Sequence, residues 1–191
     1  ADRLRTTVKQ GVDFHPYLPR EDGRLPMSDF GGVHRHNVTG LFHDMWGFPS
    51  EDPGVVHSLM RHLVDKIENN VAAMAHYKTF YLDDADLVLV SYGSSARSAL
   101  HLVENRRRRG ERYGLLELQT LWPFPTEVVR RLCAAADYIA VVEMNMGQIA
   151  REVRAAVDHP ERVYLVNRID GVFITPTDIR NMLRVIQGRG V

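Results

Sequence analysis

From residue 84 onward, short apolar runs alternate with segments of helical periodicity, and this alternation constrains the fold more than any other feature. Four strands are predicted from the runs DADLVLVSYG, RYGLLEL, DYIAVVEMN and VYLVNR, and a short fifth strand from GVFITP. Successive apolar residues in LVLV indicate a strand buried on both faces. Alternation of strand and helix at a spacing of about 20 to 30 residues predicts an α/β fold, a three-layer α/β/α arrangement with a mostly parallel sheet.

Each helix predicted between or after these strands has a recognisable beginning or end. Ser94 or Ser95 is expected to cap the first helix, and Gly110 to end it. Pro125 opens the second helix. The last helix begins in residues 175–178, TPTD, which form a variant of the capping box with proline in the first turn.

The first half of the chain has a different character. Residues 1–50 are rich in Gly, Pro, His and Asp and contain no long periodic segment. A helix capped by Asp52 follows, with apolar residues on one face, and is predicted to run to about Tyr77. We therefore divide the chain into an irregular arm with its connecting helix, residues 1–82, and an α/β domain, residues 83–191. Such a long irregular segment indicates a functional arm or one that packs on a missing partner.

The charge balance and the cysteine count exclude several classes of function. Lys plus Arg and Asp plus Glu both number 24, so neither nucleic acid nor an anionic membrane is expected as the main ligand. Cys133 is the single cysteine, which excludes an internal disulfide and any zinc site or iron–sulfur cluster held by several thiolates of this chain. The cysteine count also favours a cytoplasmic location. No apolar run approaches the ~20 residues that a transmembrane helix needs.

Ligand sites in parallel sheets lie beyond the carboxyl ends of the strands, and SYGSSARSA follows the first predicted strand at this edge. Gly93 allows a tight turn there, the N–H groups of the next helix point outward, and Arg97 lies close to its first turn. This combination is typical of a phosphate or carboxylate site. A glycine turn with a serine cap also explains it, without a ligand.

A second polar group follows the third predicted strand, where Glu143, Asn145 and Gln148 are close in sequence. Glu143 is expected beside the end of the first strand, where its carboxylate would accept hydrogen bonds from the Ser94–Ser95 turn. A residue in this place contacts a ligand, takes part in catalysis or braces neighbouring loops, and we favour the brace.

The arm contains HRHNVTGLFHD, in which three histidines and an aspartate can approach one another. The spacing of these residues matches no standard zinc motif, and no metal site is predicted. Because imidazole titrates near ~6.5, the favoured interpretation is a hydrogen-bonding or acid–base role near a substrate.

Four segments resemble, in order and spacing, the alpha subunits of 2-oxoacid:ferredoxin oxidoreductases, most closely the 2-oxoglutarate (2-ketoglutarate) branch: HNVTGLFHDMWGFP, VSYGSSARSA, LQTLWPFP and VVEMNMGQIAREV. The resemblance runs from about His36 to about Ile186 and implies a transketolase C-terminal-like domain. Alpha subunits of this family begin with a thiamine-diphosphate-binding pyrimidine domain that carries a YPITP-like motif, and nothing like that motif occurs here. The resemblance therefore implies only the C-terminal portion of such a subunit.

The family reaction converts 2-oxoglutarate, coenzyme A and oxidised ferredoxin to succinyl-CoA, carbon dioxide and reduced ferredoxin. The resemblance implies thiamine diphosphate, Mg and an iron–sulfur cluster in the complex, with a beta subunit supplying the cluster and the diphosphate end of the cofactor site. This chain is expected to bind none of these cofactors alone and to be inactive alone. It would serve subunit assembly and frame the active site. Its expected partners are the missing N-terminal half, the beta subunit and, through the complex, ferredoxin.

The resemblance also assigns residues. It places the arm near the active-site mouth and so makes four of its residues proximal to the active site: His36, Thr39, His43 and Asp44. It makes a second set the sheet-top framework or ligand contacts: Gly93, Ser94, Ser95, Arg97, Glu143, Asn145 and Gln148. Two alternatives stay open, namely the corresponding domain of pyruvate-specific or branched-chain relatives, and a stand-alone flavodoxin-like module that binds a small ligand or phosphate.

Overall fold

The computed structural model describes residue 9 and residues 13–188, and the chain divides into two compact units, residues 1–70 and 71–191. The second unit is built on a five-stranded sheet in the order β1-β3-β2-β4-β5, in which β1 is antiparallel to β3 and all other neighbours are parallel. The expected α/β class with a mostly parallel sheet is thereby confirmed. The strands are β1 (Tyr77–Phe80), β2 (Leu87–Tyr92), β3 (Tyr113–Leu118), β4 (Tyr138–Glu143) and β5 (Val163–Asn167).

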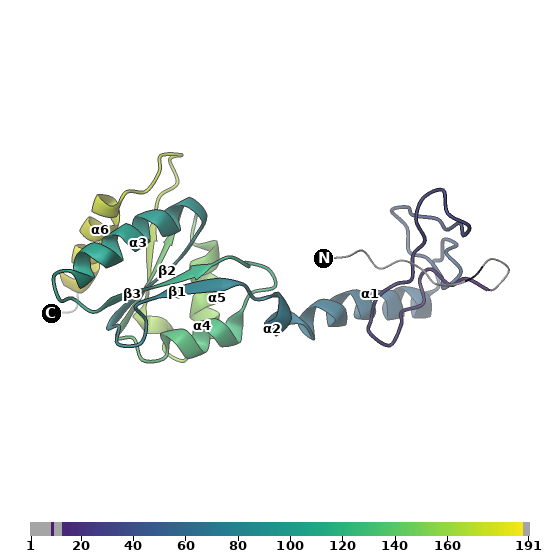
Figure 1. Cartoon of the computed structure of the whole chain (residues 1–191), viewed down its shortest axis with the longest axis horizontal. Coiled ribbons are helices and arrows are strands. Elements are labelled where there is room, and N and C mark those ends of the chain that lie inside the picture. The colour runs from purple at the N-terminus through teal and green to yellow at the C-terminus, as the bar shows by residue number, and fades with distance from the viewer. Residues whose placement is uncertain (1–8, 10–12, 189–191) are drawn as a thin grey trace. The chain divides into compact units, whose positions relative to one another are not determined.

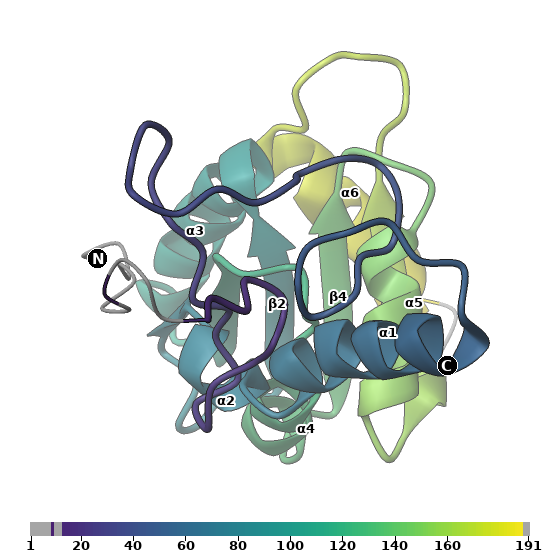
Figure 2. The same ribbon diagram turned by 90° about the vertical axis from the view of Figure 1, so that its right-hand side faces the viewer.

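Helices cover both faces of this sheet, with α3 and α6 on one face and α4 and α5 on the other (Figures 1 and 2). Because every parallel strand leads into its helix from the same edge, the β2–α3, β3–α4, β4–α5 and β5–α6 connections gather at the carboxyl edge of the sheet. The helices are α2 (Val71–Met74), α3 (Gly93–Arg107), α4 (Thr126–Cys133), α5 (Gln148–Ala156), the 3-10 turn η1 (Pro160–Arg162) and α6 (Pro176–Gly188).

The central strand β2 is buried on both faces, as the LVLV run predicts. Val88 and Val90 pack into the core on the α4–α5 side, and Leu87 and Leu89 into the core on the α3–α6 side. None of the four is more than 2% exposed. The sheet is therefore the middle layer between two layers of helices, and β2 contributes apolar side chains to the core on each side.

Cys133, at the end of α4, belongs to the core on the α4–α5 side. Burial raises the pKa of its thiol to about 12. The thiol therefore stays protonated at neutral pH and packs as a small apolar side chain.

The first unit contains α1 (Pro53–Glu68) and an irregular arm. Asp52 caps α1, because its Oδ1 accepts hydrogen bonds from the N–H groups of Gly54 at 2.9 Å and Val55 at 3.0 Å. None of the residues of α1 is fully buried. Among the described residues, no helix is long and apolar enough to cross a membrane.

The prediction of one helix reaching Tyr77 is wrong beyond Glu68, where α1 ends. The short helix α2 follows, and YKTF forms β1 against β3. A strand of four residues is too short for its periodicity to be recognised in the sequence, and it forms because β3 offers a free edge for hydrogen bonding. Both α2 and β1 lie in the second compact unit, residues 71–191.

The expected serine cap of α3 is also wrong. The helix begins at Gly93, and its N-cap, Tyr92, makes no side-chain capping hydrogen bond. Gly93 has φ +57°, a left-handed conformation that glycine adopts without strain. The tight turn predicted there is present, but it ends β2 directly and leaves no loop residue to act as a cap.

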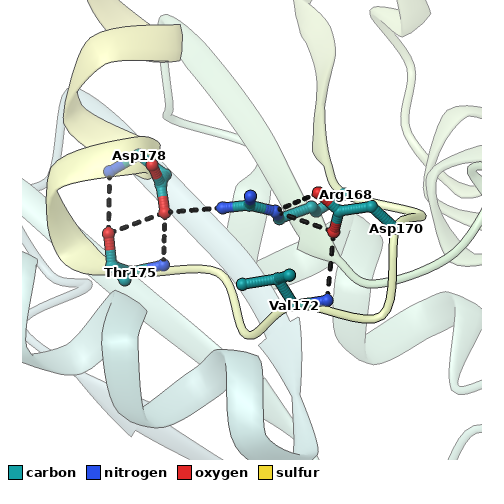
Figure 3. Close-up of polar contacts among 5 residues, drawn as sticks. All are labelled: Arg168, Asp170, Val172, Thr175 and Asp178. Atoms are coloured by element: carbon teal, nitrogen blue, oxygen red, sulfur yellow. Dashed lines mark hydrogen bonds and ion pairs between the residues drawn. The ribbon is translucent and has the colours of Figure 1, made fainter.

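The segment GVFITP forms a loop and no strand. Gly171 has φ +78° and turns the chain away from the strand direction. The predicted capping box of α6 is confirmed (Figure 3), because Thr175 N–H donates to Asp178 Oδ2 at 2.9 Å and Asp178 N–H donates to Thr175 Oγ1 at 3.2 Å.

The two-sided burial of β2 makes Val90→Ala costly. We expect it to lower the free energy of unfolding by about 2 kcal/mol, since the fully buried side chain leaves a cavity. Urea unfolding followed by circular dichroism measures the change. The matched Val185→Ala, at an exposed position of α6, should stay within about 0.5 kcal/mol of the parent. Equal effects of both changes would contradict the assignment of β2 as the core strand.

Candidate functional site

In the arm, the predicted site residues surround His43, which is only 4% exposed. Its imidazole stacks on the Tyr17 ring, with centroids 4.6 Å apart. Its Nε2 lies 3.1 Å from Oγ1 of Thr39, which accepts the N–H of Leu41 at 3.1 Å. The Thr39 hydroxyl proton is therefore available to the imidazole, and ring and hydroxyl fix each other's orientation.

Asp44 shapes the turn that follows His43. Its Oδ1 accepts the N–H groups of Trp46 and Phe48, each at 3.0 Å. Gly47 in this turn has φ +92°, and a Cβ at that position would lie 3.2 Å from the Pro16 ring. One carboxylate oxygen of Asp44 thus holds the backbone, while the other has no hydrogen-bond partner among the described residues.

His36 makes a different set of contacts. Its Nδ1 lies 3.2 Å from the hydroxyl of Ser28, which donates to the carbonyl of His34 at 2.7 Å. The Phe14 ring stacks on His34 and meets His36 edge-on. Within the described part of the chain, no group of three His, Cys, Asp or Glu side chains could hold a metal ion. In this structure the arm histidines make hydrogen bonds and ring contacts.

A surface pocket of the first unit borders these residues. Its walls come from the arm and from the first turns of α1, and the rings of Tyr17 and Trp46 face it together with His43 and Asp44. His62 also lines it, and the Nε2 of His62 is buried without a hydrogen-bond partner. The complete lining is Tyr17, Leu18, Pro19, His43, Asp44, Met45, Trp46, Asp52, Gly54, Val55, Ser58, Leu59 and His62.

In the second unit, Glu143 is fully buried at the carboxyl end of β4. Its Oε2 accepts the N–H of Ile149 at 3.1 Å, and its Oε1 accepts the N–H of Ala150 at 3.0 Å. First-turn N–H groups have no partner within their own helix, and a carboxylate at this end also interacts favourably with the helix dipole. The partners of Glu143 thus lie in α5, and the hydrogen bonds expected to the Ser94–Ser95 turn are a wrong prediction.

Glu143 bonds to α5 and not to the Ser94–Ser95 turn because the β4–α5 turn is tight. Asn145 Oδ1 accepts the N–H groups of Gly147 at 2.8 Å and Gln148 at 3.1 Å, and Gly147 has φ +87°. This turn brings the start of α5 directly over the end of β4. The Glu143 carboxylate therefore meets the N-terminus of its own following helix.

Tyr92 joins this network from β2. Its hydroxyl accepts a hydrogen bond from Asn145 Nδ2 at 2.5 Å and lies 3.5 Å from Glu143 Oε2. Burial raises the pKa of the Tyr92 hydroxyl, and the negative charge of Glu143 raises it further. Asn167, paired with Glu143 in the sheet register, donates to the carbonyl of Asn145 at 2.7 Å. Three neighbouring strands are thus tied together at their carboxyl ends.

The Gly93 turn forms a separate shallow pocket. Its lining residues are Gly93, Ser94, Ala96, Arg97, Leu100 and Glu117. Arg97 is exposed, whereas Ser95 is buried, and the Ser94 hydroxyl lies 3.9 Å from the sulfur of Met144. Glu117 places a carboxylate in the same pocket as Arg97, and its negative charge disfavours an anionic ligand there.

The structure thus groups the predicted residues into three sets. The first set lies in the arm and consists of Thr39, His43 and Asp44, whereas His36 contacts other residues. The second set is at the β4–α5 turn and consists of Glu143, Asn145 and Gln148. The third set lines the pocket at α3 and consists of Gly93, Ser94 and Arg97. Sequence reasoning missed Tyr17, Tyr92 and Asn167. Tyr92 and Asn167 each lie at the end of a predicted strand, where ligand sites of parallel sheets are found, so the sequence pattern could have identified them. Tyr17 lies in a segment without periodicity, and no pattern in the sequence points to it.

Comparisons with known proteins agree with this fold. Residues 85–179 match the family model of pyruvate:ferredoxin oxidoreductase core domain II. The chain is 34% identical over 188 residues to 2-oxoglutarate synthase subunit KorA of Methanothermobacter thermautotrophicus, covering 95% of this chain and 50% of that one. It is 37% identical over 123 residues to ketoisovalerate oxidoreductase subunit VorB of the same organism, covering 64% and 34%.

Among solved structures, 2-oxoglutarate:ferredoxin oxidoreductase from Magnetococcus marinus superposes with a TM-score of 0.82 at 22% identity, covering 94% of this chain and 32% of that one. The α/β unit therefore has the fold of an oxidoreductase core domain, with residues 85–179 matching core domain II. More particularly, the chain is a homologue of the alpha subunits of 2-oxoacid:ferredoxin oxidoreductases, as the four sequence segments indicated. It spans about half the length of the first curated relatives that it matches.

The role of Glu143 as a buried cap makes Glu143→Gln destabilising. The amide keeps one acceptor oxygen but turns its NH₂ group toward a first-turn N–H of α5, and the expected loss is about 1–3 kcal/mol in the free energy of unfolding. Urea unfolding provides the measurement. Glu152→Gln, exposed on the same helix, is the matched control and should change little. If Glu143→Gln were as stable as the parent, the capping role would be refuted.

The raised pKa of Tyr92 predicts an alkaline effect. The folded chain favours the protonated phenol, so this group's contribution to stability is fully present below the unfolded-state pKa near ~10 and is lost as the pH rises through the folded-state value. A ¹³C NMR titration of the tyrosine Cζ signals should show Tyr92 ionising above the ordinary tyrosine value of about 10. Tyr92→Phe identifies the signal. Ionisation of Tyr92 at or below that value would contradict the prediction.

Proposed function

We propose that this chain is part of the alpha subunit of a thiamine-diphosphate-dependent 2-oxoacid:ferredoxin oxidoreductase. The reaction is that of 2-oxoglutarate, coenzyme A and oxidised ferredoxin to succinyl-CoA, carbon dioxide and reduced ferredoxin. The observation that carries the proposal is the 34% identity to a 2-oxoglutarate synthase subunit along 95% of this chain. The Magnetococcus marinus enzyme, which has the same fold, was solved with 2-oxoglutarate, coenzyme A and succinyl-CoA bound, in agreement with this choice of substrates.

The chain's own part in this reaction is to frame the active site and to hold the subunits together. The described residues offer no set of three metal ligands, and the single thiol is buried and protonated. A single buried, protonated thiol does not fit an iron–sulfur cluster, which several cysteine thiolates hold. We assign the thiamine diphosphate, Mg and the cluster to the missing N-terminal half and to a beta subunit, with ferredoxin docking on the complex. The lone cysteine favours the cytoplasm as its compartment.

Within the arm, we propose that the residues around His43 lie beside the active site of the assembled enzyme. The Thr39 hydroxyl and the Tyr17 ring hold the imidazole in one orientation, and Asp44 keeps one carboxylate oxygen without a partner among the described residues. These groups can donate and accept hydrogen bonds at the bordering pocket. The other arm histidine, His36, is proposed to position this segment through Ser28.

At the sheet top, the polar residues are proposed to act as a framework. The acceptor oxygens of Glu143 and Asn145 bind backbone N–H groups of the β4–α5 turn and of α5. A fully buried carboxylate with both oxygens engaged has no lone pair directed at a ligand in solvent. Gln148 and the Gly93 turn stay at the surface, where they can meet a neighbouring subunit.

A second candidate function is a stand-alone module that binds phosphate at the Gly93 turn. The absence of a side-chain cap on α3 favours it, because the first N–H groups of that helix are left to solvent or a ligand. Glu117 in the same pocket opposes an anion. Shifts of the Ser94 and Arg97 amide signals during a phosphate or coenzyme A titration of the chain would favour this candidate.

Reconstitution tests the main proposal. We expect the isolated chain to show no 2-oxoglutarate-dependent reduction of ferredoxin and no calorimetric signal with thiamine diphosphate. Activity should appear when the remaining half of the alpha subunit and the beta subunit are supplied, with 2-oxoglutarate preferred over pyruvate and 2-ketoisovalerate. Thiamine diphosphate binding by the chain alone at micromolar concentration would overturn the assignment of the cofactor to other chains. A preference for 2-ketoisovalerate would instead assign the chain the substrate of its branched-chain relatives, the ketoisovalerate oxidoreductases.

A further inference from the structure

The imidazole of His43 is held in one orientation by its neighbours in the arm. The Tyr17 ring covers one face of it, with centroids 4.6 Å apart and the two rings within 11° of parallel. Tyr17 is itself fixed, because its hydroxyl donates to the carbonyl of Asn37 at 2.8 Å, and Asn37 Nδ2 donates to the carbonyl of Gly47 at 3.1 Å. The imidazole therefore keeps its Nε2 at Thr39.

The hydroxyl of Thr39 decides which way the hydrogen bond to Nε2 runs. Its Oγ1 accepts the N–H of Leu41 at 3.1 Å and lies 3.1 Å from His43 Nε2. Within the described part of the chain, the hydroxyl proton of Thr39 has no acceptor other than Nε2. A neutral imidazole carries a single N–H, and the hydrogen bond made by one nitrogen sets the protonation of the other. Donation from Thr39 to Nε2 therefore places the N–H of the ring on Nδ1.

The charges around the bordering pocket favour the same tautomer. His43 lines this pocket together with Asp44 and Asp52, and the lining contains no lysine or arginine. Negative charges attract the positive end of an N–H dipole and repel the lone pair of a bare ring nitrogen. Nδ1 makes no hydrogen bond to a described residue and is in contact with solvent. Its N–H is thus free for a ligand.

We infer that Thr39 is a positioning residue that fixes His43 as a hydrogen-bond donor to the pocket, through Nδ1–H. Protonation of the ring does not change this role, because an imidazolium carries an N–H on both nitrogens and Thr39 Oγ1 can then accept from Nε2. While Thr39 is in place, Nδ1 offers no lone pair and cannot act as a base toward the pocket. A group bound there must accept a hydrogen bond, as a carbonyl oxygen does.

This inference narrows the role that the sequence suggested for the arm histidines. Of a hydrogen-bonding or an acid–base role, His43 is left with donation of a hydrogen bond at the pocket. The location of this donor beside an active site rests on the proposed function, whereas the tautomer is a property of the chain alone. The two can therefore be tested separately.

The test is a two-bond ¹H–¹⁵N correlation spectrum of the histidine side chains of the full chain, which distinguishes the N–H nitrogen from the bare one. It is recorded at about pH 8.5, above the ordinary imidazole pKa near ~6.5. We expect His43 to carry its N–H on Nδ1 at least about tenfold more often than on Nε2. His57, exposed on α1, supplies the tautomer ratio of an imidazole without a fixed partner. His43→Gln identifies the signals.

Two substitutions of Thr39 show whether its hydroxyl sets the tautomer. Thr39→Val keeps the shape of the side chain without the hydroxyl, and we expect His43 to move to the tautomer ratio of His57. Thr39→Ser keeps the hydroxyl and should restore the Nδ1–H form. Val38→Ala, at the exposed neighbouring position, is the matched control and should leave the spectrum of His43 unchanged. The ring-current shift that Tyr17 imposes on His43 shows that the arm of each variant is folded.

The outcomes separate this inference from the proposed function. Nε2–H as the main form of His43 in the parent chain, or Nδ1–H retained in Thr39→Val, overturns the role of Thr39, and neither result affects the assignment of the chain to an oxidoreductase. Because the parent spectrum alone determines the tautomer, the inference stays open to refutation even if Thr39→Val does not fold. A reconstituted complex without activity refutes the proposed function and leaves the tautomer as measured.

Discussion

The carboxyl edge of the sheet depends on one buried carboxylate. Glu143 accepts two N–H groups of α5 at the point where β4 ends, and those N–H groups have no other acceptor within the helix. Asn145, Tyr92 and Asn167 add bonds around the same point and bring in β2 and β5. The relative position of the β2–α3, β4–α5 and β5–α6 connections follows from this network, and so does the placement of every candidate residue at that edge.

At the sheet top, the acceptor oxygens of Glu143 and Asn145 bind backbone N–H groups of the same domain. Gln148, Arg97 and several apolar side chains of the connections stay exposed to solvent. In the arm the balance differs, because His43 and Asp44 border a pocket. The proposed role, in which the domain frames an active site while other chains hold the cofactors, suits this division, since such a site needs a rigid framework.

How far the sequence predicts this structure depends on the length of each pattern. The LVLV strand and the TPTD cap were recognisable because a buried strand and a capping box each need a fixed local order of residues. β1 was not, since four residues form a strand only through pairing with β3. The partners of Glu143 were misjudged for a similar reason: the turn at Gly147, with its left-handed backbone, decides which helix terminus reaches the carboxylate. For the arm, the sequence could name His43 and Thr39, but not the Tyr17 ring that stacks on the imidazole.

The burial of Cys133 gives this domain an internal reporter. The thiol is 2% exposed among residues of the α4–α5 core, and its raised pKa keeps the reactive thiolate scarce at neutral pH. An alkylating reagent therefore reacts faster with the sulfur when α4 detaches from the sheet or the domain unfolds. With a single cysteine in the chain, the rate of modification reports the opening of this domain, with no engineered label and no background from a second thiol.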